Sequence, residues 1–246
     1  MKPFLLFVSF AFVAAELFAA PPKVEEIIAR LDRQQNMESQ IITYSMTIHG
    51  KRASRTVEGK SWIVGDQKSF TLYTAPAREK GSKMLKLGDK LWTYYPKADR
   101  VVSISGHMLR RSVMGSDMSY EDMMENRTLE ESYHAFLDGE EVIDGKNAYK
   151  ITLTAKTPDI AYQKMKLWVD QDKWLILRQE LYAASGKLLK EIVTLEAMKT
   201  TRGWYIKHMR FKDVLKQGKG TEFYIKEALF DQKIPKRRFS KGALRR

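Results

Sequence analysis

The sequence predicts a mainly β protein with few helices, built on one long curved antiparallel sheet. From Ile41 onward, apolar and polar residues alternate in one short run after another, which is the period of strands with one buried face. Glycine, aspartate and proline separate the runs, as hairpin turns require. Because the sequence contains little helical pattern, the apolar face of a large sheet cannot be covered completely, and we expect an apolar cavity.

The first residues have the order of a secretory signal peptide. A lysine precedes the apolar run Phe4–Ala15, which ends in small residues and is too short for the roughly 20 residues of a membrane span. We predict a signal peptide over residues 1–20, cleaved after Ala19 or Ala20. An uncleaved anchor is the alternative, and Glu16 and the two prolines that follow disfavour it.

The absence of cysteine limits the class of protein. No disulfide framework, thiolate metal site or lipid-modified N-terminal cysteine can form, and an exported chain without cysteine is more typical of a periplasm than of a eukaryotic secretory route. We predict a soluble periplasmic protein with a single domain over residues 21–246. The formal charge of +13 favours anionic partners. Nucleic acid is not among the predicted partners, because no binding motif for it is present.

The expected elements follow in chain order. A helix is predicted over Val24–Met37, where Val24, Ile27, Ile28 and Leu31 form one apolar stripe. Strand-like runs follow at Phe70–Thr74, Lys90–Tyr95, Arg100–Ser105, Tyr149–Ala155, Lys164–Asp170, Leu175–Ala183, Gly203–Val214 and Thr221–Phe230. A methionine-rich segment, Met108–Glu125, interrupts them. The basic tail Pro235–Arg246 is expected to be a loosely held extension.

Catalytic and metal signals are weak. His49, His107, His134 and His208 show no metal-ligand spacing, and no cofactor is predicted. Four carboxylates lie close together in the sequence: Asp117, Glu121, Asp122 and Glu125. On a helix Asp117 and Glu121 would share a face, as would Glu121 and Glu125. A glycosidase or a Ca²⁺ site could use such pairs, but a solvated acidic face is the favoured interpretation. A lipid hydrolase that uses Ser116 or the carboxylates from Asp117 to Asp122 stays open as an alternative, because triads assemble from distant residues.

Four motifs lie close together between Ala75 and Met123. They are a Pro-Ala-Arg-x-Lys-Gly turn, a Leu-Trp-x-Tyr-x-Pro strand end, an Arg-Val-x-x-Ile strand and a Met-Gly-Ser-Asp-x-Ser-Tyr-Glu-Asp block, at Pro76–Gly81, Leu91–Pro96, Arg100–Ile104 and Met114–Asp122. In these motifs the sequence resembles the LolA-like family of outer-membrane lipoprotein-sorting proteins. Asn36-Met37 and the spacing of Phe239 and Leu244 also agree with that family.

The resemblance implies a strongly curved, half-open barrel with helices plugging an apolar cavity. It also implies a non-enzymatic periplasmic carrier of lipid or lipoprotein acyl chains, loaded by an inner-membrane transporter and emptied at an outer-membrane acceptor. We expect the cavity wall to contain Trp62, Phe70, Leu72, Leu85, Trp92 and Tyr94. The methionine-rich segment is then expected to be a lid, which contributes Met108, Met114, Met118 and Tyr120. An envelope adaptor that binds a transporter through a strand edge or the basic tail is the other alternative.

Overall fold

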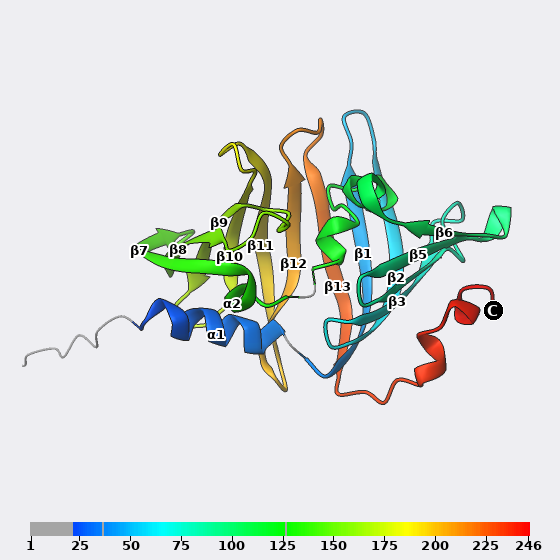
Figure 1. The fold of residues 1–246 in the computed structure, drawn as a ribbon, viewed down its shortest axis with the longest axis horizontal. Coiled ribbons are helices and arrows are strands. Elements are labelled where there is room, and N and C mark those ends of the chain that lie inside the picture. Colours follow the sequence, from blue (N-terminus) through cyan, green and yellow to red (C-terminus); the bar gives the residue numbers. More distant parts are fainter. Residues whose placement is uncertain (1–21, 36, 126) are drawn as a thin grey trace, which may run out of the picture.

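The computed structural model describes residues 22–35, 37–125 and 127–246, and this part of the chain forms two α-helices and thirteen strands (Figure 1). The helices are α1 (Val24–Gln35) and α2 (Leu129–Ser132). The strands are β1 (Ser39–His49), β2 (Ser54–Val64), β3 (Lys68–Ala75), β4 (Lys83–Leu87), β5 (Lys90–Tyr95), β6 (Arg100–Ile104), β7 (Tyr133–Ile143), β8 (Lys146–Ala155), β9 (Lys164–Asp170), β10 (Ile176–Tyr182), β11 (Leu188–Thr200), β12 (Gly203–Asp213) and β13 (Gly220–Phe230). The predicted signal peptide lies outside the described residues. Within them, no helix has both the length and the apolar character that crossing a membrane requires.

All thirteen strands belong to one sheet. Its order is β6-β5-β4-β3-β2-β1-β13-β12-β11-β10-β9-β8-β7, so β6 and β7 are the free edges and the sheet does not close. Every neighbouring pair is antiparallel. The predicted mainly β fold, a curved sheet that forms a half-open barrel, is confirmed.

Helix α1 forms where the apolar stripe predicted it. Ile27, Ile28 and Leu31 are 0–3% exposed, because residues three and four apart share one helical face. They pack with the buried side chains of β8, β9 and β10. We call the face of the sheet that α1 covers the inner face, and the opposite one the outer face.

The methionine-rich segment covers another part of the inner face. Pairing places Met46 of β1 opposite Phe223 of β13 and Val57 of β2, so one inner face runs across the middle of the sheet. The segment 105–125 packs on it in short 3₁₀ turns, Gly106–Arg110, Val113–Gly115 and Glu121–Met123, rather than as one helix (Figure 1). Met114 and Gly115, with φ of 51° and 69°, lie in the left-handed region, which breaks any helix there.

The C-terminal segment, residues 235–246, packs on the outer face. Leu244 is 0% exposed and belongs to a cluster with Phe70, Leu85 and Trp92, and Phe239 packs against the same cluster. Lys83 donates a 3.1 Å hydrogen bond to the main-chain oxygen of Leu244. The prediction of a loosely held tail was therefore wrong, because two apolar side chains anchor it among its basic residues.

Replacing Leu244 by alanine should release this segment. Removing a buried leucine side chain costs about 2–5 kcal/mol, and here the loss falls on a terminal segment that can detach without unfolding the sheet. Hydrogen exchange of residues 239–246 should accelerate strongly, while exchange in β1 and β13 stays unchanged. Leu215→Ala, at a side chain that is 59% exposed, is the matched control. Equal exchange in both variants would contradict the anchoring role.

Candidate ligand-binding cavity

A cavity of about 390 Å³ lies on the inner face between the two helices and the sheet. Its floor is apolar and comes from residues of three neighbouring strands, β9, β10 and β11. These residues are Met165, Leu167, Ile176, Leu181 and Ile192. The volume is at the lower end of the roughly 300–1,000 Å³ of small-molecule sites. Such a floor suits an apolar ligand of modest size.

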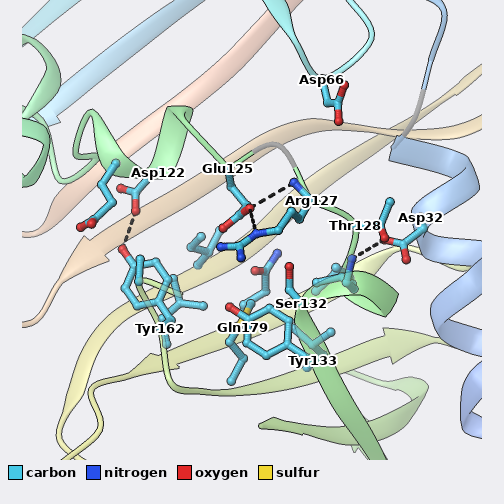
Figure 2. A pocket seen from close by; sticks show the side chains of 18 of the residues that line it. Asp32, Asp66, Asp122, Glu125, Arg127, Thr128, Ser132, Tyr133, Tyr162 and Gln179 are labelled. Carbon is cyan, nitrogen blue, oxygen red and sulfur yellow. Dashed lines mark hydrogen bonds and ion pairs between the residues drawn. The ribbon is translucent and has the colours of Figure 1, made fainter. Parts of the chain in front are cut away.

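The opposite side of the cavity is polar (Figure 2). The strand connection that leads into α2 and β7 supplies acidic and basic side chains, α1 supplies Asp32, and the turn between β2 and β3 supplies Asp66. Glu125 accepts hydrogen bonds from the main-chain and side-chain nitrogens of Arg127, and Arg127 also pairs with Asp159 at 3.0 Å. The cavity therefore has an apolar floor and a charged mouth.

Helix α2 is held in place by side chains at its first turn. Asp32 of α1 accepts hydrogen bonds from the main-chain nitrogens of Leu129 (2.9 Å) and Glu130 (3.0 Å). Thr128 and Glu131 form a capping box. Together they satisfy donors that every helix start leaves free. This fixes the wall of the cavity that contains Leu129, Ser132 and Tyr133.

Asp122 holds the other end of the mouth. Its carboxylate accepts hydrogen bonds from the Tyr162 hydroxyl, from Lys190 Nζ of β11 and, at 2.7 Å, from the main-chain nitrogen of Ser119. Lys190 is only 8% exposed, so this carboxylate, rather than water, stabilises its ammonium group. Burial, followed by the Asp122 charge, raises the pKa of Tyr162. The tyrosine therefore stays a neutral donor at the mouth.

Three uncharged polar groups lie deeper in the cavity lining. Ser132 is 1% exposed, and its buried Oγ has no hydrogen-bond partner within the described residues. Burial, followed by the Glu125 charge, raises the pKa of Tyr133 to about 12. Gln179 of β10 completes the group, and Figure 2 shows all three side chains in the lower part of the site. A ligand with a hydroxyl or carbonyl near its apolar part would satisfy Ser132, because an unpaired buried polar group is costly.

The structure brings the six predicted wall residues together, but on the outer face. Phe70, Leu85 and Trp92 are buried in one cluster there, with Trp62, Leu72 and Tyr94 packed against it. The C-terminal segment covers this cluster, and Phe70 and Leu72 also line a second, smaller groove. None of the six lines the inner cavity. Their contact with a ligand stays a prediction.

The predicted lid residues pack on the inner face, beside the cavity. Met114 and Met118 pack against Tyr44 and its neighbours in β1, β2 and β3. Tyr120 is buried in the next cluster, against which Met108 packs. Of the methionine-rich segment, Glu121, Asp122 and Glu125 line the cavity itself. A lid role for the segment stays a prediction.

The favoured interpretation of the carboxylates, a solvated acidic face, was wrong for Asp117 and Asp122. Asp117 is 6% exposed and accepts hydrogen bonds from the main-chain nitrogen of Asp213 (3.0 Å) and the Thr221 hydroxyl (2.6 Å). Ser116 is 0% exposed, and its hydroxyl bonds to the main chain of Met118. The Asp117 contacts tie the segment to β12 and β13, whereas the Ser116 hydroxyl bonds within the segment itself. Among the described residues, no group of three metal-binding side chains is present.

Comparison with known proteins places this geometry in a family. A family model described as "uncharacterized protein" matches residues 65–246. No curated protein matches the chain. A solved DUF1329 family protein from Desulfovibrio piger is 25% identical, with a TM-score of 0.82 over 89% of this chain and 96% of that one.

Two further solved structures share the fold. A putative outer membrane lipoprotein-sorting protein domain from Vibrio parahaemolyticus is 22% identical, with a TM-score of 0.79 over 90% of this chain and 97% of that one. A LolA superfamily protein from Nitrosomonas europaea is 22% identical, with a TM-score of 0.74 over 91% of this chain and 100% of that one. Since the family model matches most of its length, the chain belongs to that family, and its fold is LolA-like.

Proposed function

We propose that the protein is a periplasmic carrier that holds one acyl chain of a lipid or lipid-modified protein in the inner cavity. The observation that carries the proposal is the apolar floor on β9, β10 and β11, which the helices leave uncovered. The description of the Vibrio parahaemolyticus neighbour as a lipoprotein-sorting domain supports the same kind of cargo. In this role the cavity binds and releases its ligand without chemical change.

The binding energy comes from apolar burial. Each methylene group that moves from water to the floor contributes about 0.8 kcal/mol, so about ten methylene groups supply the roughly 8 kcal/mol of micromolar affinity. The buried Ser132 hydroxyl, with Tyr133 and Gln179 in the same lining, would receive the ester or hydroxyl end of the chain. The charged mouth would remain in contact with water. Loading by an inner-membrane transporter and delivery to an outer-membrane acceptor belong to the same proposal.

Native mass spectrometry of the protein purified from a periplasmic fraction, followed by organic extraction, tests the proposal directly. A co-purifying lipid or acylated peptide would support the carrier and name its cargo. A protein that is recovered empty and takes up no added 1-palmitoylglycerol would contradict it.

Filling the cavity should weaken uptake. Ala161 lines the cavity from the loop that precedes β9, so an indole at this position would occupy the space of the ligand. If Ala161→Trp displaces about three methylene groups, affinity for 1-palmitoylglycerol should fall more than tenfold, at about 0.8 kcal/mol each. Titration calorimetry measures the change.

Ala184→Trp, in the exposed turn between β10 and β11, is the matched control for this experiment. It adds the same side chain away from the cavity and should leave uptake unchanged. Uptake that is equally strong in both variants would place the ligand elsewhere.

A further inference from the structure

A second groove, of about 280 Å³, lies on the outer face beneath the C-terminal segment. Phe70 and Leu72 of β3 form its apolar part, together with Pro235 and Ala243 of the segment. The other four residues of its lining are all cations: Lys83, Arg237, Arg238 and Arg246. An apolar groove whose charged side chains are all basic has the character of a site for an anionic amphiphile.

The positive charge of the groove is not neutralised by side chains. Within the described part of the chain, no aspartate or glutamate forms an ion pair with any of the four cations. Lys83 donates instead to the main-chain oxygens of Leu244 and Arg246. Arg237 and Arg238 therefore have side-chain donors to offer an incoming anion.

Arg238 is already oriented for this role. Its guanidinium carbon lies 3.8 Å from the centre of the Trp62 ring and 5.8 Å from that of Phe70. Its Nε is buried without a hydrogen-bond partner in the described structure. Burial, and then the charge of Arg237, lower the pKa of Arg238. A stacked guanidinium loses little freedom when it binds a carboxylate or phosphate, and a nearby anion would relieve the repulsion between the two arginines.

We propose that this groove binds a single-chain amphiphile with an anionic head, either a carboxylate or a phosphate. The acyl chain lies along Phe70 and Leu72, and the head group pairs with Arg237 and Arg238. The site is on the face of the sheet opposite the inner cavity, so it goes beyond the carrier proposal and does not depend on it. The apolar wall predicted from the sequence, which includes Phe70 and Leu72, would then serve this second ligand.

Titration calorimetry below the micellar concentration tests the groove with three probes of equal chain length: palmitate, palmitoyl lysophosphatidate and neutral 1-palmitoylglycerol. The double variant Arg237→Gln/Arg238→Gln should bind the anionic probes roughly tenfold more weakly or worse, since each lost hydrogen bond involves a charged group. Its affinity for 1-palmitoylglycerol should not change. Whichever anion binds more tightly to the unaltered protein identifies the head group as carboxylate or phosphate.

Two controls make the result specific. Lys187→Gln/Lys219→Gln removes the same net charge at exposed positions away from the groove and should leave all three affinities unchanged. Arg237→Gln alone alters an exposed side chain and keeps the stacking of Arg238 on Trp62 intact, so weaker anion binding in this variant cannot come from a released tail. Equal loss in both double variants, or no loss in either, would overturn the proposal.

The groove proposal and the carrier proposal can be contradicted independently of each other. Ala161→Trp fills the inner cavity only, so arginine-dependent binding of palmitate should persist in that variant. If Ala161→Trp abolishes palmitate binding, the anion binds in the inner cavity, and the groove proposal is overturned. If the inner cavity takes up no 1-palmitoylglycerol, the carrier proposal is contradicted. The dependence of palmitate affinity on Arg237 and Arg238 can still be measured in the same way.

Discussion

Asp122→Asn is expected to lower the free energy of unfolding by about 3 kcal/mol, at the lower end of the cost of breaking a buried ion pair. Lys190 and Asp122 have side chains that are 10% and 16% exposed, so water can replace little of what the carboxylate provides. The substitution keeps the shape of the side chain and removes its charge. Lys190 is then left buried without a counter-charge, and Tyr162 loses a charged acceptor. Urea denaturation measures the change.

A surface pair provides the control for this prediction. Glu58 and Lys226 are joined at 2.7 Å, but both side chains are about 40% exposed. Glu58→Gln should therefore cost no more than about 1 kcal/mol. Adding Lys190→Met to Asp122→Asn should recover much of the lost stability, because the uncompensated charge is gone. Equal costs for Asp122→Asn and Glu58→Gln would show that the Lys190 charge is solvated.

Much of the fold could be predicted because its signals are local. The stripe of Ile27, Ile28 and Leu31 predicted α1, which ends two residues before the predicted Met37. The period of two in Tyr149–Ala155 and Lys164–Asp170 predicted β8 and β9 closely. Strand alternation is a property of consecutive residues, and hairpin turns connect neighbours. An antiparallel sheet built from such hairpins needs few distant contacts to be recognised.

The candidate site could not be predicted in the same way, since it depends on which face of each strand is covered. Alternation separates Met165 and Leu167 from their neighbours, but it does not tell which set faces α1. The same ambiguity placed Trp92 and Phe70 in the expected cavity, whereas the C-terminal segment covers them. The available signal was the pair of apolar residues in the basic tail, which indicated a segment that packs.

Buried charges were equally hidden from local patterns. Asp122 bonds to Lys190, 68 residues away, and Asp117 bonds to Thr221, 104 residues away. Within its own segment each carboxylate has the pattern of a solvated helix face. These two contacts form because the sheet order brings β11 and β13 under the segment 105–125. Long-range pairing of this kind has no sequence period.

Met118→Asp is expected to destabilise the protein by about 2–4 kcal/mol, because it places a charge where a half-buried methionine packs. Met118 contacts a cluster that contains Tyr44, Met46 and Tyr73, all 2–5% exposed. The neighbouring turn is anchored by Arg55, which donates to the main-chain oxygen of Met114. The segment therefore fills the space over β1, β2 and β3 in the manner of core, and urea denaturation should detect its loss.

Met118→Leu is the matched control, since a swap of similar volume costs less than about 1.5 kcal/mol. Measuring stability and 1-palmitoylglycerol uptake in both variants separates a fixed plug from a moving lid. A fixed plug predicts that Met118→Asp lowers stability strongly, with uptake reduced only as far as the fold is lost. A lid predicts unchanged stability and altered uptake, because its methionine face would leave the cluster whenever the cavity opens. Since Met118 packs against β1–β3 rather than lining the cavity floor, we expect the first result.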